Sequence, residues 1–148
     1  MAEYCRALET EIALAAANCE QQTVDTVFLG GGTPSIVPAT LMRGVLQTLR
    51  QHFNILPDAE FTSEANPGTL TDAWLDALVA AGMNRLSIGV QAKQAHLLRT
   101  LGRIHDYSQA LDALDMAKAH GVNNLNADAM FGLPGQTLAD YRETLTAL

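Results

Sequence analysis

Four short apolar runs, separated by stretches of helical period, constrain the fold of this chain more than any other feature. Apolar and β-branched residues, followed by glycine, proline or a polar residue, predict strands over residues 24–29, 59–65, 85–90 and 124–130. Apolar residues at helical spacing predict helices over 3–20, 38–53, 71–81, 93–101, 107–120 and from 137 to the end of the sequence. Because crossover helices join parallel strands, this alternation indicates an α/β fold with a parallel sheet.

The number of strands limits the size of that sheet. The strands recur about every 25 to 39 residues, as successive βα units do in barrels and doubly wound sheets. Four strands are too few to close a barrel. We therefore expect either an arc of a larger barrel or a small open sheet, in one domain that spans residues 1–148, with an unpaired edge at residues 24–29.

The acidic composition argues against nucleic acids and acidic membranes as partners. Nine Lys and Arg residues against sixteen Asp and Glu give a net charge of −7, whereas nucleic acids and acidic membranes attract positive surfaces. No apolar run reaches the roughly 18 to 20 residues of a membrane span. Residues 1–4 also lack the basic start of a secretory signal. We therefore expect a cytoplasmic protein with no nucleic-acid partner and no membrane span.

Polar side chains interrupt or follow three of the expected strands. Glu64, Gln91 and Asp128 lie at strand ends, where parallel α/β folds gather their functional residues. Taken singly, Glu64 could accept from a loop amide, Gln91 could bond to the backbone and Asp128 could pair with an arginine. Their shared position instead favours one polar ligand, because a buried polar group without a partner costs a few kcal/mol.

A triple glycine, Gly30 to Gly32, follows the first expected strand and precedes Thr33. Glycine lets a ligand approach the backbone, and its N–H groups can hold an anion. The alternative is a tight strand-to-helix turn without a ligand. The run matches neither the dinucleotide-binding nor the Walker pattern. Arg103, between two expected helices, could reach a carboxylate on the same rim or lie on the surface.

The cysteines and histidines offer no metal-ligand spacing. Cys5 and Cys19 fall on one expected helix about 21 Å apart, too far for a disulfide, and we expect both to fill the core. The histidines are scattered, and we expect surface or helix-capping positions for His52, His96, His105 and His120. We assign no metal ligand and no catalytic residue.

Five segments in order carry a resemblance to a known family. They are residues 30–35 (GGGTPS), 64–69 (EANPGT), 84–91 (NRLSIGVQ), 101–105 (LGRIH) and 126–136, with NAD at its start and GLPGQ at its end. The series resembles the radical S-adenosylmethionine (SAM) proteins of the oxygen-independent coproporphyrinogen III oxidase family. It is more similar to the haem-chaperone branch (HemW-type) than to the oxidase branch (HemN-type).

The resemblance implies an incomplete partial (β/α) barrel that holds SAM at its strand ends. It implies that Gly31, Gly32 and Thr33 contact the methionine amino group. It also implies that Glu64, Gln91, Arg103 and Asp128 line the SAM site, where Arg103 could pair with the SAM carboxylate and Asp128 could bond to the ribose or position a neighbour. Haem or a porphyrinogen, and a haem-acceptor protein, are the implied partners.

The family's 4Fe–4S cluster motif, C-x-x-x-C-x-x-C, is absent from this sequence. The resemblance places it before residue 1, so we expect an N-terminally incomplete copy that performs neither SAM cleavage nor oxidation by itself. Ala92 and Lys93 also replace the Ser-Phe pair that usually follows Gln91. Two alternatives stay open: a non-catalytic module that binds adenosyl compounds or haem, and an unrelated phosphate-binding α/β enzyme that uses the glycine run.

Overall fold

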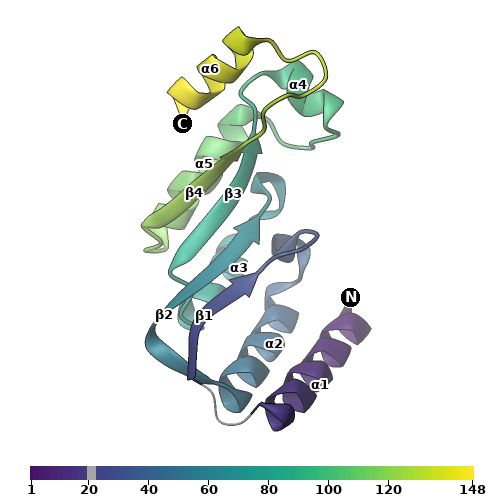
Figure 1. Ribbon diagram of the computed structural model, residues 1–148, viewed down its shortest axis with the longest axis vertical. Coiled ribbons are helices and arrows are strands. Elements are labelled where there is room, and N and C mark those ends of the chain that lie inside the picture. Colours follow the sequence, from purple (N-terminus) through teal and green to yellow (C-terminus); the bar gives the residue numbers. More distant parts are fainter. Residues whose placement is uncertain (20–22) are drawn as a thin grey trace.

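The computed structural model describes residues 1–19 and 23–148, and it has the expected alternation of helices and strands (Figure 1). The elements are α1 (Ala2–Asn18), β1 (Thr23–Leu29), α2 (Ala39–His52), β2 (Asn54–Ala65), α3 (Asp72–Ala80), β3 (Arg85–Gln91), α4 (Ala95–Thr100), α5 (Tyr107–Ala119), β4 (Asn124–Ala129) and α6 (Leu138–Ala147). Short 3-10 turns occupy Pro34–Ile36 and Pro67–Thr69. Residue 20, where the first helix was expected to end, lies outside the described residues.

The four strands form one parallel sheet in the order β1-β2-β3-β4. The expectation of a four-stranded parallel α/β sheet is therefore confirmed. Within the described residues β1 pairs only with β2, so the expected edge at β1 is also present. The pairing brings the carboxyl ends of all four strands to one rim of the sheet.

One face of the sheet carries the core and the other faces outward without helices (Figure 1). Phe61, Leu86 and Ile88 pack from the strands against Trp74 and Leu78 of α3, and all five are fully buried. Most residues of opposite parity on β2 and β3 are polar, since side chains alternate across a strand. The uncovered face is therefore lined with polar groups that the core does not use.

Local sequence signals set several helix ends. Asp106 caps α5 and exchanges hydrogen bonds with Gln109, and Thr137 does the same for α6 with Asp140. Gly82 follows α3 with φ +98° and Gly121 follows α5 with φ +84°, backbone angles that favour glycine. None of the helices in the described part of the chain combines the length and apolar character that crossing a bilayer requires.

Candidate functional site

A cavity of about 240 Å³ opens at the carboxyl ends of the strands. Residues from all four strand ends line it, together with the loop between α4 and α5. Six of the seven residues predicted from the sequence are among them: Gly32, Thr33, Glu64, Gln91, Arg103 and Asp128. The seventh, Gly31, donates a backbone hydrogen bond to Glu64 at the cavity's edge. The predicted convergence of these residues is therefore present in the fold, while their role in binding stays a prediction.

The glycine run forms a loop that is held in place by the loop after β2 and by α3. Gly31 and Gly32 have φ values of +81° and +58°, which a residue with a Cβ rarely adopts. Behind them, Ser35 Oγ lies 2.6 Å from Thr69 Oγ1 and accepts from the backbone N–H of Asn66 at 3.0 Å. The buried indole N–H of Trp74 donates to the carbonyl of Pro34 at 3.2 Å. The loop is therefore anchored to the core.

Glu64 lies beside that loop. It both lines the cavity and accepts a hydrogen bond from a loop amide, which was the alternative role considered for it. Its Oε2 accepts from the backbone N–H of Gly31 at 3.3 Å, so it does contact a loop amide. The side chain also lines the cavity. An N–H group of the glycine run is therefore already occupied by a carboxylate of the protein.

Gln91 ends β3 at an irregularity in the sheet. Its φ of 68° is the one positive φ of a non-glycine residue in the described chain, and the β3–β4 register shifts between Ile88 and Gln91. Its carbonyl accepts from the N–H of Met130 at 2.9 Å, which holds this bulge. The residue is only 8% exposed and lines the cavity, where Gly89 leaves room for its amide.

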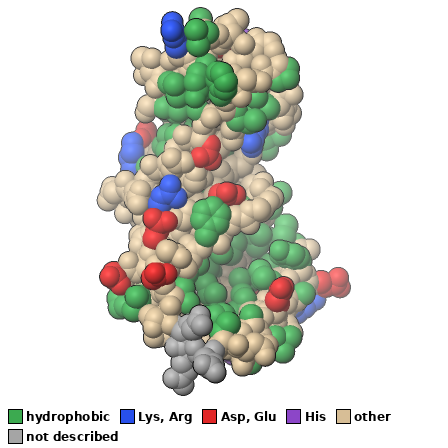
Figure 2. Space-filling model, viewed as in Figure 1, with side chains coloured by type: hydrophobic (Ala, Val, Ile, Leu, Met, Phe, Trp, Pro, Cys, Tyr) green, Lys and Arg blue, Asp and Glu red, His purple; other side chains and the backbone are tan. Residues whose placement is uncertain are grey.

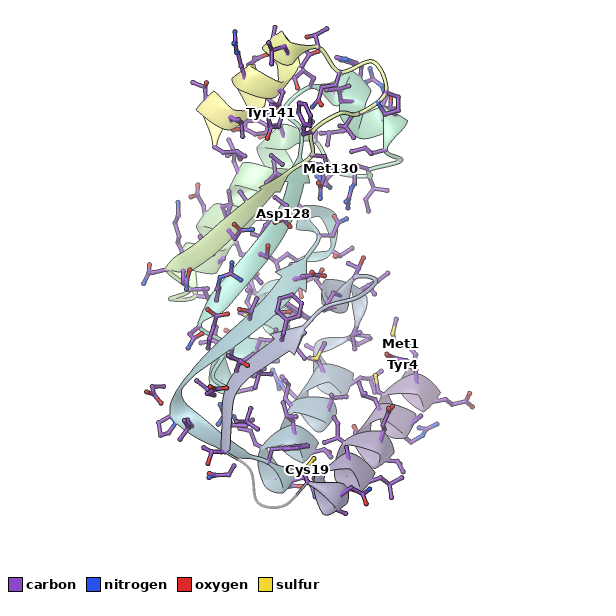
Figure 3. All side chains as sticks on the ribbon, viewed as in Figure 1. Met1, Tyr4, Cys19, Asp128, Met130 and Tyr141 are labelled. Atoms are coloured by element: carbon purple, nitrogen blue, oxygen red, sulfur yellow. The ribbon has the colours of Figure 1, made fainter. Side chains whose placement is uncertain are left out.

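Asp128 is held by two neighbours that the sequence prediction did not include. Its Oδ1 accepts from Asn126 Nδ2 at 2.6 Å and from Ser87 Oγ at 3.1 Å, and its Oδ2 lies 3.2 Å from the same hydroxyl. It does not pair with an arginine in the described structure. Figure 3 labels Asp128 near the end of β4, next to β3. The alternation of polar residues along β3 and β4 is the sequence signal from which these two neighbours could have been found.

Arg103 lines the same cavity from the loop after α4. The preceding Gly102 has φ +67°, and the backbone N–H of Arg103 donates to the carbonyl of Leu98. No ion pair joins its guanidinium to a carboxylate among the described residues, so its charge is available to a ligand.

His105, expected at the surface or at a helix cap, is instead buried. It is 4% exposed, and neither ring nitrogen has a hydrogen-bond partner within the described residues. Burial lowers its pKa, and the nearby charge of Arg103 adds to this, although the Val90 carbonyl and Asp106 act in the opposite direction. The burial of His105 in the loop between α4 and α5 therefore favours the neutral form of its imidazole.

The thiols do not assemble a metal centre. Cys5 is buried, but Cys19 is exposed just beyond the end of α1, which corrects the expectation of two core residues. No cluster of three or more metal-ligating side chains occurs in residues 1–19 and 23–148. The residues described here therefore do not fit an iron–sulfur cluster, which needs several thiolates.

A larger cavity, of about 650 Å³, lies between α2 and α3. Arg43, Arg50 and Asp76 line it with alanines and glutamines, and Arg50 Nε donates to the carbonyl of Ala81 at the end of α3. Size alone does not make a functional site. The smaller cavity is the stronger candidate because polar groups from four strand ends converge on it.

Comparisons with known proteins find relatives over nearly the whole chain. Residues 6–148 match the radical SAM superfamily. The heme chaperone HemW of Mycobacterium tuberculosis is 38% identical over 95% of this chain and 36% of its own length. That of Synechocystis sp. is 42% identical over 97% of the chain and 34% of its own length. The chain thus spans about a third of the length of these curated relatives.

A solved structure supports the fold comparison. Coproporphyrinogen III oxidase (HemN) from Escherichia coli, described as a radical SAM enzyme, superimposes with a TM-score of 0.90 at 33% sequence identity. The match covers 98% of this chain and 33% of that structure. The open four-stranded sheet therefore corresponds to about a third of that longer chain.

Proposed function

Since this chain belongs to the radical SAM superfamily, we propose that its strand-end cavity binds S-adenosylmethionine. The observation that carries the proposal is the charge of the cavity. Glu64 and Asp128 both line it, and Arg103 is the one cation among its described lining residues. A ligand with positive charges near one carboxylate fits this arrangement, and SAM carries an ammonium, a sulfonium and a carboxylate.

The ammonium, the carboxylate and the adenosyl part of SAM each have complementary groups at this rim. The backbone of Gly31, Gly32 and Thr33 supplies carbonyls for the ammonium, and Arg103 faces the carboxylate. Gln91 and Asp128 offer hydrogen-bonding groups to the adenosyl part. The cavity is smaller than the roughly 300 to 1,000 Å³ of a typical ligand pocket, so part of the ligand would extend along the uncovered face of the sheet.

Bound SAM would bring a sulfonium whose carbon–sulfur bonds can be cleaved by a reductant. This chain's described residues do not fit the 4Fe–4S cluster that supplies the electron in the family, so we derive no redox step for them. Their part is to bind and orient the adenosyl ligand.

We extend the proposal to haem and porphyrin metabolism. The named relatives are heme chaperones and a coproporphyrinogen III oxidase. Haem or a porphyrinogen is the expected second ligand, and a haem-acceptor protein is the expected partner of a chaperone-type role. The cytoplasmic location stays a prediction from the sequence.

Phosphate binding by the glycine run is less compatible with this geometry. Gly31 N–H already donates to Glu64, and a phosphate there would face two carboxylates. The following helix, α2, begins only at Ala39, so its N-terminus does not directly follow the glycines as in phosphate-binding loops.

Calorimetry with SAM tests the proposal, with inorganic phosphate as the comparison ligand. We expect binding of SAM, loss of at least tenfold in affinity in Asp128→Ala, and a similar loss in Gly32→Val. Gly121→Val is the matched control, because Gly121 also has a positive φ and an open surrounding but lies at the end of α5. Absence of SAM binding by the unmodified chain, or binding of phosphate in preference, would contradict the proposal.

A further inference from the structure

We propose that Asn126 and Ser87 are positioning residues that fix the Asp128 carboxylate as an acceptor for ribose hydroxyls. Selectivity for a ribose over a deoxyribose would then depend on the two residues that hold this carboxylate in place. This inference rests on the proposed adenosyl ligand and on the ribose contact that the family resemblance implies for Asp128. What it adds is the role of the two residues that orient the carboxylate.

The backbone register brings the three side chains together. Ser87 of β3 and Asn126 of β4 are directly paired in the sheet. Asp128 follows two residues after Asn126, so it lies on the same face of β4. That face is the uncovered one, and both Ser87 and Asp128 line the strand-end cavity. The juxtaposition therefore follows from strand pairing and does not depend on a flexible loop.

The hydrogen bonds form a closed triangle. Asn126 Nδ2 donates to Asp128 Oδ1 at 2.6 Å and to Ser87 Oγ at 2.9 Å. Ser87 Oγ in turn donates to the Asp128 carboxylate, 3.1 and 3.2 Å from its two oxygens. The amide orientation is determined by its partners, because the amide oxygen in place of Nδ2 would face a carboxylate. Every member of the triangle thus has one compatible orientation.

The triangle determines what Asp128 can recognise. The protein donates to the carboxylate from the strand side, and its remaining lone pairs are directed away from those donors. An ionised carboxylate only accepts hydrogen bonds, so the ligand must offer donors. Neighbouring hydroxyls of a ribose are such donors, whereas a deoxyribose offers one fewer. Hydrogen bonds to a charged group are stronger than neutral ones, and a missing one lowers affinity by on the order of tenfold.

The experiment measures ribose selectivity in variants of the whole chain. SAM is displaced by adenosine, 2′-deoxyadenosine or 3′-deoxyadenosine in competition calorimetry. We expect the unmodified chain to prefer adenosine about tenfold over at least one deoxy form. In Asn126→Ala and Ser87→Ala this preference should fall to about twofold or less. Asn124→Ala, at the exposed position two residues earlier on β4, should leave it unchanged.

The selectivity ratio separates positioning from a general structural role. A variant that only loosens the fold weakens adenosine and deoxyadenosine equally and keeps their ratio. An unchanged ratio in both variants, or no ribose preference in the unmodified chain that binds SAM, overturns the inference and leaves SAM binding intact. Failure of the unmodified chain to bind SAM overturns the proposed function, and this inference falls with it.

A measurement on the unmodified chain covers the case in which both variants fail to fold. The side-chain amide protons of Asn126, observed by NMR, should exchange slowly with solvent because both acceptors hold Nδ2. The exposed amide of Asn124 serves as the internal reference. Equal, fast exchange of the two side-chain amides would show that the triangle does not persist in solution and would overturn the inference.

Discussion

Gln91 combines an unfavourable backbone conformation with a place at the cavity. A non-glycine residue at φ 68° costs on the order of 1 kcal/mol, and the bulge between β3 and β4 maintains it. A Cβ on Gly89 would stand 2.8 Å from Nε2 of Gln91, so this glycine is what allows the amide its present position. The conformation directs a polar side chain at the strand end into the site.

Gly89→Ala should therefore displace the Gln91 amide. Because the amide is the end of a flexible side chain, we expect the free energy of unfolding to change by less than about 1 kcal/mol. SAM affinity should fall by about tenfold, which calorimetry can measure.

The control for this variant is Gly44→Ala in α2. There a Cβ would also displace the end of a flexible polar side chain, that of Glu9, but outside the residues that line the cavity. Equal SAM affinities in Gly89→Ala and the unmodified chain would show that the position of Gln91 does not matter for the ligand.

The individual residues of the site differ in how far the sequence predicts their position. Glu64, Gln91 and Asp128 could be located because strand ends converge in any parallel sheet. The burial of His105 could not, because it depends on how the loop after α4 packs against residues distant in sequence. Asn126 and Ser87 were not predicted as site residues, because their role depends on the pairing of β3 with β4, which the sequence pattern does not specify.

At the scale of elements, His120 joins the end of α5 to the start of α3. Its ring nitrogens lie 2.9 Å from carboxylate oxygens of Asp72 and Asp76. The hydrogen bond to Asp72 is the largest cause that raises the pKa of His120. Partial burial lowers this pKa, whereas Asp76 raises it further. Protonated His120 can donate to both carboxylates at once, whereas the neutral ring can donate to only one.

The stabilisation by this contact should depend on pH. Because the folded-state pKa is raised, the contribution is fully present below the unfolded value of about 6.5 and is lost as pH rises through the folded pKa. Thermal melting of the unmodified chain and of His120→Gln, between pH 5 and pH 9, should show a difference in Tm that shrinks as pH increases.

His52→Gln, at the exposed end of α2, is the control and should show no such trend. A difference in Tm for His120→Gln that stays constant from pH 5 to pH 9 would mean that the charge of His120 contributes nothing to the contact.

Element ends were predictable wherever the signal was local. Asp106 with Gln109, and Thr137 with Asp140, are capping boxes readable from four consecutive residues, and both are present. The start of β2 was not predictable in this way. The strand begins at Asn54, before the predicted start at residue 59, and it includes Pro57, a residue type that ordinarily argues against a strand. The expectation that Cys19 lies in the core was wrong, because α1 ends one residue before it and the side chain is exposed.

At the scale of the whole molecule, hydrophobic side chains gather between the edge strand and the α1–α2 pair (Figure 2). An apolar groove of about 320 Å³ runs there, lined by Leu8 and Ile12 of α1, Val24 and Phe28 of β1, and Leu49 of α2, among others. A free strand edge beside an apolar groove is a surface that promotes pairing between chains. Phe28 is 62% exposed in this region.

We expect the chain to self-associate as its concentration rises, which sedimentation velocity can detect. Thr26→Lys places a charge on the edge strand and should lower the association. Thr10→Lys makes the same change of charge at an exposed site on α1 and should not. A monomer at all concentrations, or equal effects of the two variants, would contradict this expectation.

The overall architecture was the most predictable level. Alternating periodicity is sufficient for a parallel four-stranded α/β sheet, because few other topologies join parallel strands. That residues 1–148 form one partial core domain stays a prediction.

The indole of Trp74 has a wider consequence. Its ring is packed in the core while its N–H donates to the carbonyl of Pro34, two residues past the glycine run. We therefore expect the loop and the interior to melt together on heating. The proposed ligand binding and cooperative folding should then be lost at one temperature. A substitution of Trp74 would disturb both the core packing and the loop.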